Sequence, residues 1–206
     1  MQHPSPRFHA TPAAGATLVE LLVGLAIVSV LALIGYPALF SASSALRLDL
    51  AAHELVGTLR LARATAVREG ANVGLKLYPR PDGLVEWRLH RDGDGDGVRT
   101  RDIEQGVDPP IGPRRTFVHF GRDVGFGFPP DVVPRDPGDP RRRLDRLDDP
   151  VRFNRSDIAS FGPLGTSTPG TLYLTSGGVH LAAVRVFGRT GKVRILRYRA
   201  RDETWR

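Results

Sequence analysis

Three aspartates alternate with glycines in one short segment of the chain, Asp92-Gly93-Asp94-Gly95-Asp96-Gly97. Carboxylates at alternate positions, with a glycine after the third, resemble the beginning of a calcium-binding loop. The closing acid of a helix–loop–helix calcium loop starting at Asp92 would be residue 103, which is Ile103. Two interpretations therefore remain open: a looser calcium site formed by Asp92, Asp94 and Asp96, or a polar hairpin turn, for which Asp-Gly is a strong signal.

A second charged group lies near the C-terminal end, where Arg189, Lys192 and Arg194 follow one another in a glycine-bounded segment. The formal net charge of the chain is +7, which is compatible with an anionic partner such as nucleic acid or lipid headgroups. Contacts of such side chains with phosphates are non-specific and weaken with salt. These three residues are either a basic face that contacts the phosphates of nucleic acid or the solvated face of a strand in an arginine-rich protein.

The residues that enzymes most often use do not form a recognisable constellation. The chain has no cysteine, which excludes a disulfide, a thiolate nucleophile and a Cys-ligated zinc site. It also has no Gly-x-Ser-x-Gly elbow, no His-Glu-x-x-His motif and no phosphate-binding loop. A single-span membrane hydrolase is therefore disfavoured, and we expect a protein that is not an enzyme and that has no cofactor, calcium apart.

An apolar run from Leu18 to Phe40 is the longest hydrophobic feature of the sequence, and Glu20 is its single charged residue. As a helix, this run is roughly 35 Å long, enough to span a hydrocarbon core of about 30 Å. Residues 1–15, which precede it, are polar and lack the apolar core of an ordinary secretory signal peptide. Pro37 would weaken the helix near its far end.

The hydrophobic pattern changes twice after this run. From residue 41 to residue 70, apolar side chains recur every three or four positions, which predicts an amphipathic helix that ends at Glu69-Gly70. Beyond Gly70 the period becomes two, and no helical segment is expected. The predicted strands include Val73–Leu77, Val85–Leu89, Phe117–Phe120, Thr171–Thr175, His180–Phe187 and Val193–Tyr198.

Together these patterns predict an α+β fold, in which a long N-terminal helix, first transmembrane and then amphipathic, packs on an antiparallel β-sheet head. The predicted organisation is a leader at 1–15, a transmembrane segment at 16–40, an amphipathic helix at 41–70, and a β-rich head at 71–206 with an exposed insertion near 129–155. The insertion is rich in proline, aspartate and arginine, a composition with little to bury.

The segment Gly15-Ala16-Thr17-Leu18-Val19-Glu20-Leu21 resembles the cleavage and export motif of type IV prepilins and type II secretion pseudopilins. The resemblance implies a pilin-like fold and cleavage by a prepilin peptidase between Gly15 and Ala16, followed by N-methylation of Ala16, where the family usually has phenylalanine. It further implies that Glu20 pairs with the amino terminus of a neighbouring subunit, and that Pro37 is the usual helix kink.

Two further stretches, Leu59–Arg68 with Val73-Gly74-Leu75 and Gly188–Arg194, resemble the GspH/FimT family of minor pseudopilins. This resemblance implies a structural subunit of the type II secretion pseudopilus, which exports proteins across the outer membrane. The alternative is a minor pilin of a type IV pilus, acting in pilus assembly or in DNA binding and uptake. The implied partners are other pseudopilins or pilins, the prepilin peptidase and the inner-membrane assembly platform. The implied location is the inner membrane, single-pass, with the N-terminus cytoplasmic before processing and the head periplasmic.

Overall fold

The computed structural model describes residues 17–153 and 157–206. The predicted leader and the predicted cleavage site between Gly15 and Ala16 lie outside the described residues. The chain divides into two compact units, residues 1–40 and residues 41–206, and each is described by itself below.

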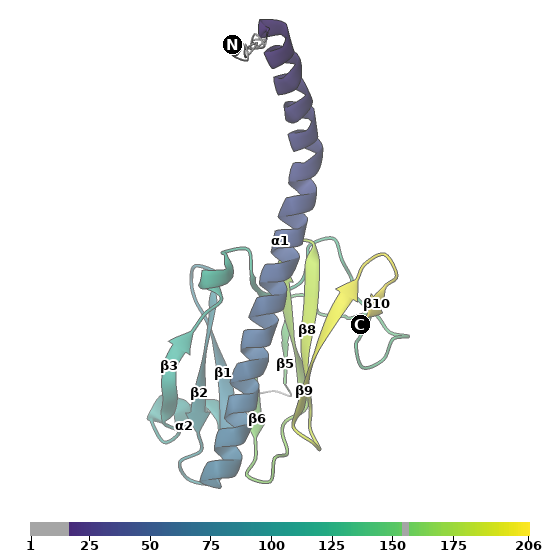
Figure 1. The fold of residues 1–206 in the computed structure, drawn as a ribbon. Coiled ribbons are helices and arrows are strands. Elements are labelled where there is room, and N and C mark those ends of the chain that lie inside the picture. Colours follow the sequence, from purple (N-terminus) through teal and green to yellow (C-terminus); the bar gives the residue numbers. More distant parts are fainter. Residues whose placement is uncertain (1–16, 154–156) are drawn as a thin grey trace, which may run out of the picture. The chain divides into compact units, whose positions relative to one another are not determined.

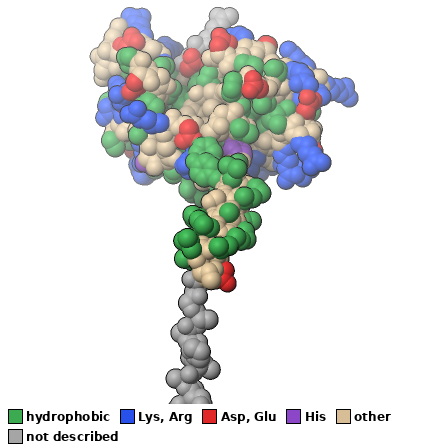
Figure 2. Space-filling view, turned by 90° about the horizontal axis from the view of Figure 1, so that it is seen from above, with side chains coloured by type: hydrophobic (Ala, Val, Ile, Leu, Met, Phe, Trp, Pro, Cys, Tyr) green, Lys and Arg blue, Asp and Glu red, His purple; other side chains and the backbone are tan. Residues whose placement is uncertain are grey.

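Helix α1 spans Leu18–Glu69, and its first part forms the described portion of the first unit. All large apolar side chains from Leu18 to Phe40 are at least half exposed, and Figure 2 shows hydrophobic side chains covering this part of the helix. By its length and composition the helix could cross a membrane. Pro37 lies inside the helix, so one carbonyl of the preceding turn loses its intrahelical partner.

The second unit combines the rest of α1 with antiparallel sheets (Figure 1), which confirms the predicted α+β class. The predicted apolar stripe of the helix is buried at the expected spacing. Its members are Leu48, Ala52, Leu55, Leu59, Ala62 and Ala66. The helix ends at Glu69, as expected, and Gly70 follows with φ of 65°, a left-handed conformation that glycine adopts without strain.

One sheet has four strands in the order β3-β2-β1-β6, and every neighbouring pair is antiparallel. Its strands are β1 (Val73–Pro79), β2 (Val85–Arg91), β3 (Pro110–Arg115) and β6 (Ile158–Phe161). The other sheet has the order β10-β9-β8-β7-β4, and β5 also pairs with β7. Its strands are β4 (Gly125–Phe126), β5 (Val151–Arg152), β7 (Gly170–Ser176), β8 (His180–Phe187), β9 (Lys192–Arg199) and β10 (Thr204–Trp205).

The main core lies between the buried stripe of α1 and both sheets. Trp87, Phe153 and Phe161 are its largest fully buried side chains. A smaller cluster lies around Tyr173 and Leu144. Burying an apolar side chain stabilises a fold by about 1.5–3 kcal/mol, so these contacts hold the head together without a disulfide.

The segment Phe117–Phe120, predicted to be a strand, forms the 3₁₀ turn η1 (Val118–Phe120) instead. In a strand, residues three apart would point to opposite faces, whereas a 3₁₀ turn brings them to the same side. The turn places the Phe117 and Phe120 rings on one side, with centroids 6.5 Å apart. The Phe117 ring packs on the Trp87 ring, with their centroids 4.3 Å apart. This aromatic packing outweighs the strand propensity of the segment.

The expectation that no helix interrupts the head is also wrong. Helix α2 spans Thr100–Gln105, and Gly106 follows it with φ of 77°. The segment has no apolar face and no buried side chain, so hydrophobic periodicity gave no signal for it.

The segment predicted as an exposed insertion near 129–155 is mostly loop in its described residues. It differs from the expectation in that some of its side chains, among them Leu144 and Phe153, are buried. Its strand β5 pairs with β7. These contacts tie the insertion to the second sheet.

Candidate functional sites

Glu20 lies in the first turn of α1, where it caps the helix together with Thr17. The Thr17 backbone N–H and hydroxyl donate to Glu20 Oε2 at 2.8 and 3.0 Å, and the Glu20 N–H donates to Thr17 Oγ1 at 3.3 Å. This reciprocal pattern is a capping box. Sequence reasoning missed it, although a threonine three residues before a glutamate is its signature.

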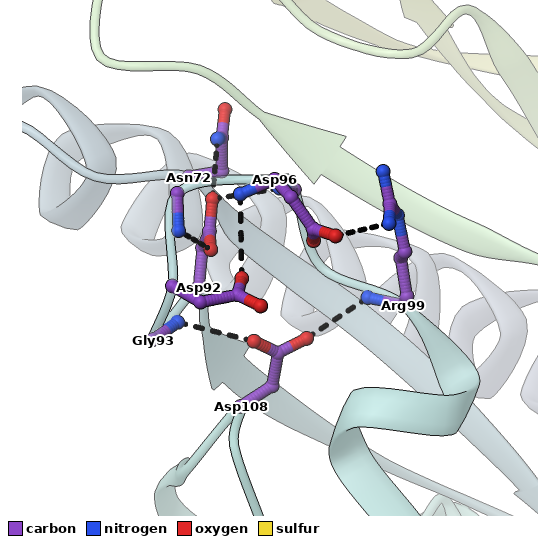
Figure 3. Close-up of polar contacts among 9 residues, drawn as sticks. Asn72, Asp92, Gly93, Asp96, Arg99 and Asp108 are labelled. Carbon is purple, nitrogen blue, oxygen red and sulfur yellow. Dashed lines mark hydrogen bonds and ion pairs between the residues drawn. The ribbon is translucent and has the colours of Figure 1, made fainter.

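The alternating aspartates form the connection between β2 and α2, and Asp92 is its central acceptor (Figure 3). Asp92 Oδ2 accepts hydrogen bonds from Asn72 Nδ2 at 2.7 Å and from the Gly97 N–H at 2.9 Å, while Oδ1 accepts from the Gly95 N–H at 2.7 Å. Burial raises the pKa of Asp92, but these hydrogen bonds outweigh it, so the pKa lies below its usual value. The loop is therefore wrapped around this carboxylate.

A fourth aspartate, Asp108, completes the loop, and sequence reasoning did not find it. Asp108 is fully buried. Its Oδ1 accepts a hydrogen bond from the Gly93 N–H at 3.1 Å, and its Oδ2 accepts one from the Arg99 N–H at 2.9 Å. Helix α2 lies between the loop and Asp108 in the sequence, so no motif of short spacing could have indicated that Asp108 belongs to the loop.

Asp92, Asp94 and Asp96 each offer a carboxylate oxygen within 4.8 Å of the others, so the structure brings the predicted calcium ligands together. Asp94 Oδ1 accepts a hydrogen bond from the Asp96 N–H at 3.3 Å, and the Asp96 carboxylate forms an ion pair with Arg99. Desolvation and the carboxylates of Asp94 and Asp102 raise the pKa of Asp96, although Arg99 opposes the shift. Carboxylate oxygens suit calcium, and the ion pair with Arg99 engages Oδ2 of Asp96.

Arg189 lies in the turn between β8 and β9, Lys192 and Arg194 belong to the start of β9, and all three side chains are exposed. Arg194 lies directly opposite Arg185 in the register of the two strands. Both guanidinium groups flank the Phe187 ring, at 5.8 and 5.3 Å from its centroid. The structure therefore brings Lys192 and Arg194, two of the predicted residues, to the same face of the sheet as Arg185.

An open groove of about 840 Å³ lies between the last turns of α1 and the same β8–β9 turn. Its lining residues are Arg60, Arg63, Ala64, Val67, Arg68, Thr190, Gly191, Lys192 and Val193. The helix arginines were not singled out from the sequence. Their recurrence at three- to five-residue spacing on the solvent side of an amphipathic helix was the available signal.

A glycine, Gly191, allows the walls of this groove to approach each other. Gly191 has φ of 59°, and a Cβ at this position would lie 2.4 Å from the Gly165 carbonyl oxygen and 2.8 Å from Arg63 Nε. Arg63 Nε donates a hydrogen bond to that same carbonyl at 3.2 Å. The turn is thus fixed against the helix by backbone that only glycine permits.

Comparison with known protein families finds two matches. Residues 51–191, more than half of the 206 residues, match the family described as Type II transport protein GspH. Residues 12–36 match the prokaryotic N-terminal methylation motif, and this range includes Gly15, Ala16 and Glu20. No curated protein and no solved structure matches the chain.

Proposed function

The chain belongs to the GspH family of type II transport proteins, and we propose that it is a minor pseudopilin of a type II secretion pseudopilus. Pilins and pseudopilins are structural proteins that assemble with other pilins after processing by a prepilin peptidase. One observation carries the proposal: an apolar helix segment, Leu18–Phe40, whose large side chains are all at least half exposed, belongs to the same chain as a folded β-rich head. Such a surface needs lipid before assembly and apolar partner helices after it.

The proposed location is the inner membrane, with residues 16–40 spanning it and the head in the periplasm. A prepilin peptidase would cut between Gly15 and Ala16 and methylate Ala16. Mass spectrometry of the protein extracted from membranes tests this step. A mature chain that begins with methylated Ala16 is expected in cells with the peptidase, and an intact leader in those cells would refute the processing.

Glu20 is proposed to pair with the amino terminus of a neighbouring subunit, in addition to capping its own helix. Substitutions can separate the two roles. Glu20→Gln keeps an N3 side chain that can form a capping box but removes the charge, whereas Thr17→Ala removes the cap and keeps the charge. We expect Glu20→Gln to abolish assembly into filaments and Thr17→Ala to leave it largely intact, as measured by crosslinking of membranes. Glu104→Gln, on an exposed site in α2, is the matched control. The opposite pattern would assign Glu20 to capping alone.

A second candidate function is that of a minor pilin in a type IV pilus, with DNA held at the β8–β9 turn. The side chains of Arg189, Lys192 and Arg194 are exposed and form no ion pair with an acidic side chain among the residues that the structure describes. This favours the second candidate, because phosphate contacts need cations that are accessible. Retardation of DNA by the full-length chain in neutral detergent tests it. The Arg189→Ala, Arg194→Ala double variant should lose a salt-sensitive shift, and no shift with the unsubstituted chain would overturn this candidate.

Calcium binding by Asp92, Asp94 and Asp96 also remains a proposal, supported by the closeness of their carboxylates. Calorimetric titration of the full-length chain with calcium tests it. Heat of binding that disappears in Asp94→Asn is expected. Asp94 is the choice because its carboxylate accepts a single long hydrogen bond, from the Asp96 N–H at 3.3 Å, whereas Asp92 accepts two from the loop backbone. No heat at millimolar calcium would leave the polar turn as the sole interpretation.

A further inference from the structure

The groove between the last turns of α1 and the β8–β9 turn combines an aliphatic floor with a cationic rim. Ala64 and Val67 on the helix and Val193 on β9 supply the floor. The Val67 side chain is 53% exposed, so part of this apolar surface faces water. Arg60, Arg68 and Lys192 supply the rim. A ligand that fits both surfaces must carry apolar groups and negative charges close together.

The rim is not neutralised within the chain. Among residues 17–153 and 157–206, neither Arg60 nor Lys192 forms an ion pair with an acidic side chain. Arg68 pairs with Glu69 through a single contact of 3.0 Å. Arg189 and Arg194 lie just beyond the rim and raise the local positive charge further. Gathering like charges is unfavourable unless an anionic ligand offsets their repulsion.

The chemistry of the floor favours a peptide over a nucleic acid. No aromatic side chain lines the groove, so bases would find no ring on which to stack. A sugar–phosphate backbone would also leave Val67 and Val193 without apolar contacts. An extended peptide places alternate side chains on opposite sides. Apolar residues could therefore cover the floor while the intervening carboxylates reach the guanidinium groups of the rim.

We propose that this groove binds an acidic segment of a partner protein in which carboxylate and aliphatic residues alternate. The proposal goes beyond the helix-mediated assembly described above, because it assigns a separate recognition surface to the head. The Gly191 turn lies against Arg63, and Arg63 Nε donates to the Gly165 carbonyl, which fixes one wall of the groove. Binding would therefore not have to order the turn.

The test uses the full-length chain in neutral detergent and a short fluorescent peptide that alternates glutamate and leucine. Fluorescence anisotropy should show binding that weakens as salt rises. The double charge reversal Arg60→Glu, Lys192→Glu should weaken it by about tenfold or more. Arg201→Glu, a reversal at an exposed arginine outside the groove, should change it by less than about twofold.

Two further comparisons separate the floor from the rim and the peptide from other polyanions. Val67→Ser should weaken peptide binding about threefold without changing its salt dependence, since it removes apolar contact only. A peptide with serine in place of each leucine should bind to the unsubstituted chain as weakly as the leucine peptide binds to Val67→Ser. Equal binding of the leucine and serine peptides would overturn the proposal in favour of a general polyanion site. So would an oligonucleotide that displaces the peptide from the unsubstituted chain and whose own binding is abolished by Arg60→Glu, Lys192→Glu. DNA binding lost only in the Arg189→Ala, Arg194→Ala variant would leave it standing.

Discussion

The Asp92–Gly97 loop and the β8–β9 turn are both short, rich in glycine and strongly charged, but their charges have different partners. In the loop, Asp92 accepts three hydrogen bonds, and the buried Asp108 accepts two from the backbone. At the turn, the side chains of Arg189 and Lys192 are exposed and form no ion pair within the described chain. Asp92 and Asp108 therefore have hydrogen-bond donors inside the chain, whereas Arg189 and Lys192 have no acidic partner among the described residues.

This difference shows that charge density alone does not identify a binding site. A charged group with hydrogen-bond partners inside the chain contributes to stability, and its removal leaves those partners without an acceptor. A charged group without partners contributes little to stability and can be used for recognition. Substitutions in the loop should therefore act on unfolding, and those at the turn and the adjoining groove should act on binding.

The largest loss of stability is expected for Asp108→Ala. It leaves the N–H groups of Gly93 and Arg99 without their acceptor in a buried site, which should cost about 4 kcal/mol of unfolding free energy. Urea unfolding of the full-length chain in detergent, followed by the fluorescence of buried Trp87, measures this. Asp108→Asn keeps one acceptor oxygen and should cost about half as much. A loss below about 1 kcal/mol for both variants would show that the loop does not depend on Asp108.

Asp92→Asn should cost about 3 kcal/mol at neutral pH, because an amide nitrogen would replace an oxygen that accepts hydrogen bonds. The pKa of Asp92 is lowered in the folded protein. Its stabilisation is therefore fully present above the unfolded-state pKa near about 4 and is lost as the pH falls through the lower folded-state value. The stability difference between the parent and Asp92→Asn should shrink below about pH 4. A pH-independent difference would assign the loss to shape and not to charge.

The α+β class, the buried stripe of α1 and the helix end at Gly70 could be predicted from the sequence, because each depends on local periodicity or on a single glycine. The 3₁₀ turn η1 could not be predicted in this way, because the packing of Phe117 on Trp87 determines its conformation. Asp92, Asp94 and Asp96 were found because they are adjacent in sequence. Asp108 and the helix arginines were not, because only the folded chain brings them to the loop and to the turn.

Gly191→Ala tests whether the β8–β9 turn is fixed against the helix, and it should cost about 2 kcal/mol. The added Cβ would strain a left-handed backbone and approach the Gly165 carbonyl. Gly178→Ala is the matched control, since Gly178 has φ of 67° but open space around its Cβ position. It should cost about 1 kcal/mol. Equal costs for the two variants would indicate that the turn is not held in place by close contact.

The smallest effect on stability is expected at the groove itself. Arg60→Ala and Lys192→Ala should each change the unfolding free energy by less than about 0.5 kcal/mol, because neither side chain has an acidic partner in the part of the chain that the structure describes. Arg63→Ala should cost about 1 kcal/mol, since Arg63 Nε donates to the Gly165 carbonyl. At low salt, removing Arg60 or Lys192 should even stabilise the head slightly, because it relieves repulsion between cations, and the gain should vanish as salt screens them. Urea unfolding at two salt concentrations distinguishes these outcomes. A clear loss of stability from Arg60→Ala or Lys192→Ala at both salt concentrations would mean that these charges serve the fold, and the contrast with the aspartate loop would then disappear.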